Sequence, residues 1–378
     1  MKRVNVKARV TNLSILFVLC FSAVRVAKAD FVFGPPENLG PPVNSASHEG
    51  VFWISAHELE LYFTSIRPGG YGGWDIWFTS RASKEAEWNQ PVTLGANVNS
   101  TFNTGSVVVS PDGLELYCEA PPNWEEGYGS VDIWVCRRAT AADPWGPAIN
   151  LGPTINSAAD EICYSMSSDG LELYFADGFV AAPRPGGQGG RDIWVTRRES
   201  LSDPWKLPAN LGAPVNTSAN EYAPFISADG LALFFASHGA PGSGIDDDIW
   251  ITTRASLSGP WRVPCRLAPP VNLSGLADSV PRVSVDGSTI YFYSSRPGGY
   301  GGGDIWQASI EPIVDFNGDS LVDCIDICDM IDHWGSDNSL YDIGPMPWGD
   351  GVVDAQDLRI LAEHIVVDAA DVNDVGGR

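Results

Sequence analysis

Short runs of alternating apolar and polar residues recur along the chain, separated by Asp-Gly turns and Gly-rich loops. A typical unit has an alternating run, a Ser-x-Asp-Gly turn, a Leu-x-Leu-Tyr-Phe run and a Gly-rich loop. An Asp-Ile-Trp run follows, and a Trp-x-x-Pro-x-Asn-Leu-Gly segment ends the unit. Alternation with a period of two is typical of half-buried strands, and Asp-Gly between two such runs indicates a hairpin. Each unit therefore predicts about four short antiparallel strands.

The unit occurs five times. Its Asp-Ile-Trp string stands at Asp75–Trp77, Asp132–Trp134, Asp192–Trp194, Asp248–Trp250 and Asp304–Trp306, in steps of 57, 60, 56 and 56 residues. A unit of this size cannot bury both faces of its sheet alone, so successive units are expected to stack around an axis. The sequence predicts an all-β, five-bladed β-propeller of four-stranded blades.

The two ends of the repeat region predict how the ring closes. The tryptophan of the last segment occurs only four times, as Trp88, Trp145, Trp205 and Trp261. Phe33, followed five residues later by Asn38-Leu39-Gly40, supplies the missing segment at the other end of the repeat region. We therefore expect the N-terminal strand to complete the fifth blade and to remove an open sheet edge.

The repeats resemble the WD40-like (PD40) repeats of bacterial TolB-type propellers. The strings that carry the resemblance are Ser-x-Asp-Gly, Leu-Tyr-Phe, Pro-Gly-Gly-x-Gly-Gly and Asp-Ile-Trp, and they extend over residues 31–312. The resemblance implies the fold. It leaves the function open, because propellers serve binding, scaffolding and catalysis alike.

The N-terminus has the three-part pattern of a secretory signal peptide. Residues 1–9 are basic, residues 13–24 are almost wholly apolar, and Ala27-Lys28-Ala29 places small residues before a cleavage point. Residues 1–29 are therefore expected to be removed, which leaves residues 30–312 for the propeller. No later segment is apolar for long enough to span a membrane, so we expect a secreted protein.

Composition excludes two classes of protein. A hydrophobic content of 44% is too high for a disordered chain. A net charge of −24 repels phosphate backbones, which excludes a nucleic-acid partner. Because export permits disulfides, Cys118 and Cys136 carry one further hypothesis: they lie on two strands of one hairpin, where a bridge could form.

One repeated set of positions carries candidate chemistry. Six residues before the Ser that ends each inner strand stand Glu49, Thr104, Glu161, Glu221 and Asp278. Inner strands line the channel of a propeller, so the four carboxylates are expected at one mouth of it. They either hold turns and neighbouring blades by hydrogen bonds, or bind a cation or sugar hydroxyls, or act as acid and base in glycoside hydrolysis. Their equivalence favours the first role, because glycoside hydrolases normally take their acids from non-equivalent positions.

The last part of the chain changes to a strongly acidic composition with the spacing of a calcium loop. Oxygen ligands occupy positions 1, 3, 5, 9 and 12 of a 12-residue loop, with a backbone carbonyl at position 7: Asp315, Asn317, Asp319, Asp323, Asp326 and the carbonyl of Leu321. Hard oxygen ligands at these positions bind Ca²⁺. In a second half, Asp350, Asp354 and Asp357 match positions 5, 9 and 12. Positions 1 and 3 fall on Met346 and Trp348, so Asp342 is expected to take the first position through a lengthened loop.

These loops and the helices that follow resemble a divergent type I dockerin module over residues 313–367, with a tail at 368–378. The resemblance implies Ca²⁺ as a cofactor and a cohesin-like extracellular protein as a partner. Positions 10 and 11 of the loops are Cys324-Ile325 and Ala355-Gln356, where dockerins usually carry small hydroxylic residues.

Together these observations predict a secreted, non-catalytic propeller that binds protein or carbohydrate, with a calcium-dependent module for docking to an extracellular partner. One alternative is a TolB-like envelope component held by protein contacts alone. The other is a glycoside hydrolase that acts on a polysaccharide. Its acids would come from Glu49, Glu161, Glu221 and Asp278.

Overall fold

The structure, a computed structural model, describes residues 31–120, 127–178, 182–240, 246–319, 321–338 and 340–365. The predicted signal peptide at residues 1–29 and the tail at 368–378 lie outside the described residues. In the described part of the chain, no helix has the length and apolarity needed to cross a membrane.

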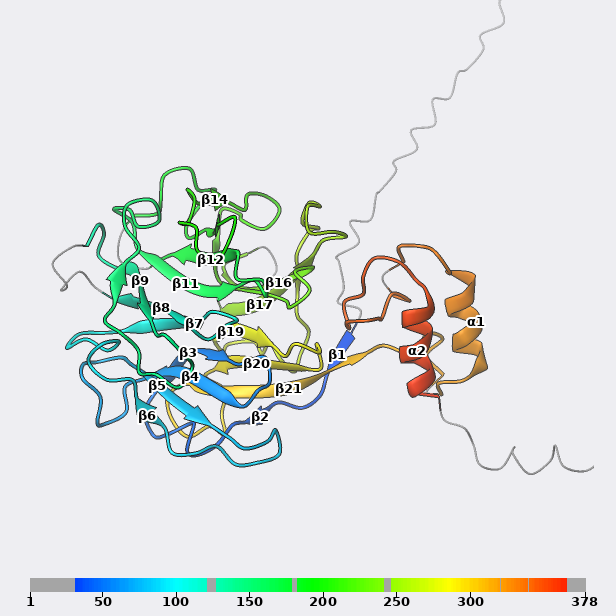
Figure 1. The fold of residues 1–378 in the computed structure, drawn as a ribbon. Coiled ribbons are helices and arrows are strands. Elements are labelled where there is room, and N and C mark those ends of the chain that lie inside the picture. The colour runs from blue at the N-terminus through cyan, green and yellow to red at the C-terminus, as the bar shows by residue number, and fades with distance from the viewer. Residues whose placement is uncertain are drawn as a thin grey trace, which may run out of the picture.

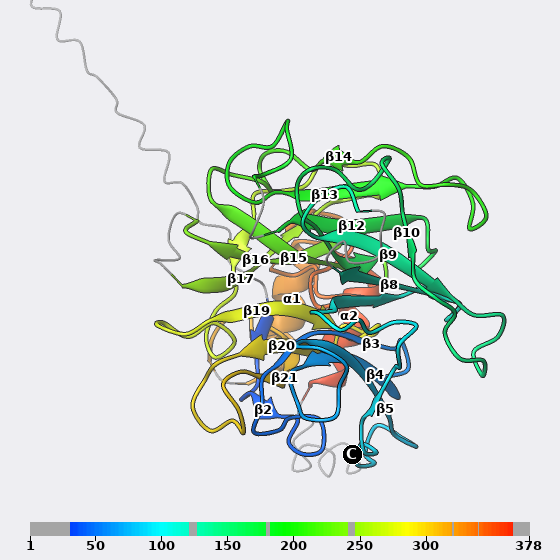
Figure 2. The ribbon, with the colours of Figure 1, turned by 90° about the vertical axis from the view of Figure 1, so that its left-hand side faces the viewer.

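Five antiparallel sheets stand around a central axis, as Figure 2 shows. Blade one contains β3 (Glu49–Ile54), β4 (Glu60–Ser65), β5 (Asp75–Ser80) and β6 (Val92–Thr93). Blade two contains β7 (Gly105–Val109), β8 (Glu115–Ala120), β9 (Asp132–Arg137) and β10 (Ile149–Asn150). Blade three contains β11 (Glu161–Met166), β12 (Glu172–Asp177), β13 (Ile193–Arg197) and β14 (Ala209–Asn210). Blade four contains β15 (Asn220–Ile226), β16 (Ala232–His238), β17 (Asp247–Thr253) and β18 (Cys265–Arg266).

The fifth blade is completed by the N-terminus. It contains β19 (Asp278–Val283), β20 (Thr289–Ser294), β21 (Asp304–Pro312), β1 (Phe31–Phe33) and β2 (Glu37–Asn38). Phe33 pairs with Ile310, and Asn38 pairs with Trp306. The inner strands contact one another in the order β3, β7, β11, β15, β19 and again β3. The predicted five-bladed ring and its N-terminal closure are therefore confirmed.

The Asp of each Asp-Ile-Trp string holds the Gly-rich loop before it. In blade one, Asp75 Oδ2 accepts hydrogen bonds from the amides of Tyr71 (2.8 Å) and Gly72 (3.2 Å). A Cβ atom on Gly70 would stand 1.9 Å from that oxygen, so the loop requires glycine there. Because the same pattern recurs in blades two, three and five, the loops serve the fold.

The predicted disulfide is wrong: Cys118 and Cys136 are free, buried thiols. The register of β8 and β9 explains this, because Cys118 pairs with Trp134 and Cys136 pairs with Leu116. The two cysteines are thus diagonal neighbours, a relation in which Cα atoms lie about 7–8 Å apart. A disulfide usually needs about 4.4–6.8 Å.

The C-terminal module contains two helices, α1 (Cys324–Asp332) and α2 (Ala355–Glu363). Met330, Ile343, Val353 and Leu361 form its buried core. Figure 1 shows the two helices beside the ring, and Figure 2 shows them behind its centre. The module therefore lies against one face of the propeller.

Candidate functional site

The four repeated carboxylates are buried where their inner strands begin. Glu49, Glu161 and Asp278 are the first residues of β3, β11 and β19, and Glu221 is the second residue of β15. Each of these side chains is at most 1% exposed. Thr104, the fifth member of the set, directly precedes β7 and is equally buried.

Each carboxylate holds the loop that precedes its strand. Glu49 accepts hydrogen bonds from the amide of Ser45 (2.9 Å) and its hydroxyl (2.7 Å), and pairs with Arg67 at 2.9 Å. Glu161, Glu221 and Asp278 accept the corresponding loop amides. Glu161 and Asp278 also pair with arginines, at 2.8 and 2.9 Å. The contacts lie within each blade, which is the geometry of the first role considered above.

Burial raises the pKa of two members of this set. It raises the pKa of Glu161 to about 7, against the opposing effects of the Ser157 hydrogen bonds and the Arg184 charge. Burial likewise raises the pKa of Glu221. Carboxyl groups that are hydrogen-bonded to their own loops contribute first to the shape of the blade.

A second polar set lies at the ring axis and differs from blade to blade. We call it the axial cluster; it consists of Glu119, Asp160, Tyr164, Arg191, Tyr222 and Asp247. The charges of these residues act on one another: Asp160 on Glu119, Glu119 on Tyr164, and Asp247 on Tyr222. The cluster brings together side chains of blades two, three and four, and none of its members was predicted as a site residue.

Glu119 reaches the axis because a glycine stands in front of it. Glu119 pairs with Gly105 on the inner strand of blade two, and a Cβ atom on Gly105 would lie 2.1 Å from Glu119 Oε1. The inner strand is bulged directly after this pair, where Ser106 has a φ of 35°. The inner strands of the other four blades have a register shift at the corresponding place, so the bulge belongs to the repeat.

The carboxyl group of Glu119 has one oxygen that no described residue pairs with, and a raised pKa. The side chain as a whole keeps partial exposure, whereas its Oε2 atom is buried and has no hydrogen-bond partner among the described residues. Burial, and after it the negative charge of Asp160, raises the pKa of Glu119 to about 8. At neutral pH this group is mostly protonated, so it offers a hydroxyl donor beside a carboxylate acceptor.

Arg191, Tyr222 and Asp247 form a second group within the axial cluster. The Arg191 guanidinium lies 5.1 Å from the centroid of the Tyr222 ring. Burial, and after it the charge of Asp247 and a hydrogen bond to it, raises the pKa of Tyr222. Asp247 also lies 3.0 Å from Nδ1 of His238. The charges of Glu119 and Arg191 both act on Tyr164, which links this group to Glu119 and Asp160.

A buried arginine stands on the axis next to the cluster. Arg282 is 1% exposed and donates to the carbonyls of Pro281 and Tyr164, each at 2.7 Å. Its guanidinium lies 5.7 and 5.6 Å from the ring centroids of Phe52 and Phe225. Burial lowers the pKa of Arg282 to about 10, so it stays charged at neutral pH. This charge holds blades three and five together at the axis.

At the end of the axis formed by the Ser-x-Asp-Gly turns, the ring has an apolar cavity. It has a volume of about 550 Å³ and is lined by the last residues of the inner strands, among them Trp53, Ile54, Met166, Phe225 and Val283. The two ends of the axis therefore differ: one carries the polar axial cluster, and the other is apolar.

The sequence indicates the axial cluster only at positions where one blade departs from the residues of the other four. The position of Glu119 holds Thr64, Ala176, Ala236 and Tyr293 in the other blades. A search for repeated residues passes over such a position. A search for charged residues that depart from the repeat would have found Glu119, Arg191 and Asp247.

The two acidic loops of the C-terminal module have matching hydrogen bonds. In the first, Asp326 Oδ1 accepts the amide of Phe316 (2.8 Å), and Oδ2 accepts the amide of Asp323 (2.9 Å). In the second, Asp357 Oδ1 accepts the amide of Ile343 (2.6 Å), and Oδ2 accepts the amide of Asp354 (2.6 Å). Both loops end in a helix capped by an Asp.

These bonds show how the second loop corresponds to the first. Phe316 follows Asp315, and Ile343 follows Asp342, so Asp342 occupies the place of Asp315. The loops span 315–326 and 342–357, which makes the second four residues longer. Burial raises the pKa of Asp342 to about 6. Within the described residues, no three or more Asp, Glu, His or Cys side chains converge as a metal site.

Comparison with known proteins supports the fold. No protein-family model and no curated protein matches the chain. Among solved structures, a BT0996 RGII complex is similar with a TM-score of 0.50 and 10% identity, over 75% of this protein and 93% of that one. A thermostable family-43 glycoside hydrolase has a TM-score of 0.46 and 15% identity, over 72% and 90% of the two proteins. A putative TolB from Agrobacterium tumefaciens has a TM-score of 0.41 and 15% identity, over 66% and 70%.

Proposed function

We propose that the protein is a secreted, non-catalytic binding propeller whose axial cluster binds a carbohydrate. The observation that carries this proposal is the contrast between the two polar sets. The repeated carboxylates are occupied by loop hydrogen bonds within their own blades, whereas Glu119 has a buried oxygen without a partner among the described residues.

The chemistry of the cluster suits a polyhydroxylated ligand. A sugar hydroxyl both donates and accepts hydrogen bonds, so it needs donors and acceptors side by side. The protonated Glu119 and the Arg191 guanidinium donate, while Asp160 and Asp247 accept. The buried Tyr222 ring packs against the Arg191 guanidinium. The net charge of −24 disfavours a polyanion, which makes a neutral polysaccharide the expected class.

Glycoside hydrolysis is the second candidate, and one observation favours it. Glu119 and Asp160 are two neighbouring carboxyl groups in different environments, and the pKa of Glu119 is raised to about 8. Pairs of this kind divide acid and base roles in hydrolases. The catalytic alternative for Glu49, Glu161, Glu221 and Asp278 stays a prediction, tested by the same assay.

Affinity gel electrophoresis against soluble xylan, mannan and glucan, followed by chromatography of the products, separates these candidates. We expect one polysaccharide to retard the wild type without being shortened. Arg191→Ala should abolish the retardation, and Arg137→Ala, on an exposed side chain outside the cluster, should leave it unchanged. Shortened products that vanish in Glu119→Gln would establish the hydrolase instead. Equal retardation of Arg191→Ala and wild type would refute binding at the axial cluster.

We further propose that the C-terminal module binds Ca²⁺ and docks to an extracellular protein. The donor chemistry supports this, since both loops present hard oxygens and begin capped helices. Asp315, Asn317, Asp319, Asp323, Asp326 and the Leu321 carbonyl would hold the first ion, and Asp342, Asp350, Asp354 and Asp357 the second. The ion would neutralise the crowded carboxylates and so stabilise the module.

Circular dichroism of the full-length protein tests the calcium proposal. We expect added Ca²⁺ to raise helicity, and the double variant Asp315→Ala, Asp326→Ala to lose most of this gain. A wild type without any calcium response would refute the proposal. Secretion has its own test, because N-terminal sequencing of the exported protein should begin at Asp30.

A further inference from the structure

A recurring set of four side chains latches neighbouring blades together. Between blades two and three, the Arg198 guanidinium stacks on the Trp205 ring at 4.4 Å and donates to Glu115 at 3.0 Å. The Trp205 indole donates to the Tyr117 hydroxyl at 3.3 Å, and that hydroxyl donates to Glu115 at 2.7 Å. The latch thus joins an Arg–Trp stack of one blade to a Tyr of the blade before it.

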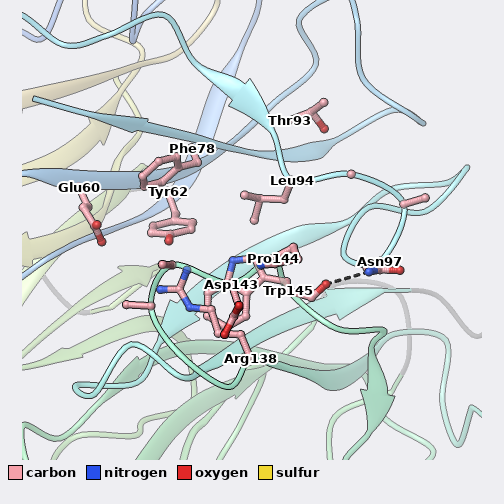
Figure 3. Close-up of a pocket in the computed structure, with 14 residues that line it drawn as sticks. Glu60, Tyr62, Phe78, Thr93, Leu94, Asn97, Arg138, Asp143, Pro144 and Trp145 are labelled. Atoms are coloured by element: carbon pink, nitrogen blue, oxygen red, sulfur yellow. Dashed lines mark hydrogen bonds between the residues drawn. The ribbon is translucent and has the colours of Figure 1, made fainter.

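Three other interfaces have the same Arg, Trp and Tyr. The Glu position holds Glu60 and Glu172 in two of them, whereas between blades five and one it holds Thr289, and Tyr291 donates to Glu58 of blade one. The Arg–Trp stacks are Arg138–Trp145 at 4.1 Å, Arg254–Trp261 at 4.5 Å and Arg81–Trp88 at 4.4 Å. The tyrosines that face them from the preceding blade are Tyr62, Tyr174 and Tyr291. Figure 3 shows the first of these sets, with Arg138 and Trp145 on one side of an interblade groove and Tyr62 on the other.

The interface between blades four and five lacks every member of the latch. Ala232 stands at the Glu position, Phe234 at the Tyr position, Ile310 at the Arg position and Phe33 at the Trp position. All four are buried in one apolar cluster. This seam includes the N-terminal strand that closes the ring, so the ring closes where its polar latch is missing.

A side chain of the C-terminal module covers this seam. Trp348 is 8% exposed and belongs to the same apolar cluster, with its ring centroid 5.6 Å from that of Phe234 in an edge-on arrangement. Its indole donates to Asp229 Oδ2 at 3.1 Å, in the Ser-x-Asp-Gly turn of blade four. Met346 packs against the cluster as well.

The module also replaces a contact that blades three and four make by themselves. A Cβ atom on the turn glycines Gly170 and Gly230 would meet Leu201 and Leu257 of their own blades at 2.8 and 2.7 Å. At the equivalent Gly287 of blade five, the nearest atom is Cδ of Pro347, at 2.7 Å. The module therefore fits the seam as a missing part of the blade.

We propose that the C-terminal module is an intramolecular clamp on the closing seam of the propeller, with Trp348 in the role of the missing latch. Trp348 lies in the segment by which the second acidic loop is longer than the first, between Asp342 and Asp350. The Asp342 carboxylate accepts the amide of Asp350 at 2.9 Å just after this segment. Ring stability is consequently coupled to calcium in the second loop, a part of the proposal that rests on the calcium binding proposed above.

Hydrogen exchange of the full-length protein, followed by mass spectrometry, tests the clamp. Trp348→Ala should speed exchange in β1, β16 and β21 about tenfold or more, the factor that corresponds to about 1.4 kcal/mol. Strands β4 and β9, at a latched interface, should be much less affected. Trp334→Ala is the matched control, because Trp334 lies in the same module and is 48% exposed. Trp348→Phe keeps the ring contact without the indole donor and should give an intermediate effect if Trp348→Ala does not fold.

The coupling to calcium is tested separately, by hydrogen exchange with and without Ca²⁺. In wild type, Ca²⁺ in place of EGTA should slow exchange in β1 and β21, and Asp342→Asn should remove this effect while Trp348 still protects in EGTA. Equal exchange in Trp348→Ala and Trp334→Ala would overturn the clamp. If calorimetry shows calcium binding but Ca²⁺ does not slow exchange in β1 and β21, the coupling of ring stability to calcium is refuted and the clamp is not. A wild type that binds no calcium would instead contradict the proposed function, with the Trp348 comparison in EGTA still deciding the clamp.

Discussion

Glu119→Gln should make the protein less sensitive to alkaline pH. The folded state holds the pKa of Glu119 at about 8, against an ordinary value of 4.5, because of burial and the neighbouring Asp160. Between these two pH values the folded state binds a proton that the unfolded state releases. The contribution of Glu119 to stability is therefore fully present below about pH 4.5 and is lost as pH rises through about 8.

The size of the effect follows from the shift. Each pKa unit corresponds to about 1.4 kcal/mol, so between pH 5 and pH 8.5 the wild type should lose up to about 4 kcal/mol at this one group. Glutamine keeps the shape of the neutral acid and has no proton to lose. Three other carboxyl groups lower stability as pH rises, but they do so equally in wild type and in Glu119→Gln. They are Glu161, Asp177 and Asp342, with pKa values raised to about 7, 6 and 6.

Urea unfolding followed by tryptophan fluorescence, at pH 5, 6, 7 and 8.5 and at one calcium concentration, gives the comparison. The difference in unfolding free energy between Glu119→Gln and wild type should grow in favour of the variant as pH rises. Glu87→Gln, at an exposed position, serves as the control. Parallel pH profiles for Glu119→Gln and wild type would refute the reasoning, because they would mean that Glu119 is not held protonated at the axis.

Three further predictions concern the ring. Deletion of residues 30–40 removes β1 and β2 from β21, so thermal melting should move to a sharply lower temperature; an unchanged melt would contradict N-terminal closure. Gly105→Ala places a Cβ atom 2.1 Å from Glu119 Oε1 and should cost about 1–3 kcal/mol in urea unfolding, with the loss removed in a Glu119→Ala background. Glu49→Gln leaves Arg67 without its buried partner and should cost about 3–5 kcal/mol in the same assay; a cost below that of an exposed Glu→Gln change would contradict its structural role.

The repeats made the architecture predictable, because each blade repeats the same physical solution. Asp75 and its equivalents hold the Gly-rich loops, and alternating apolar residues form the strands. Closure was predictable from one irregularity, the missing fifth tryptophan with Phe33 in its place. The position of Asp342 as the first residue of a longer second loop could also be expected from its spacing.

Features that depend on side chains of different blades were not predictable from the repeat. Glu119 and Arg191 each occur once. The charges of both act on Tyr164, and the position of Glu119 depends on Gly105 of the neighbouring strand. The cysteine prediction failed because Cys118 pairs with Trp134 and Cys136 with Leu116, so the two cysteines are diagonal and not directly opposite. Trp348, read along the sequence as an interruption of a calcium loop, is explained only by its contact with the seam.

The most direct test of the account is calorimetric titration of the purified full-length protein with an oligosaccharide of the polysaccharide that it retains, with the mixture analysed afterwards by chromatography. The account predicts saturable binding to wild type, loss of binding in Arg191→Ala and an uncleaved oligosaccharide in every sample. Unchanged binding by Arg191→Ala, or recovery of shortened sugars from the wild-type sample, would contradict it.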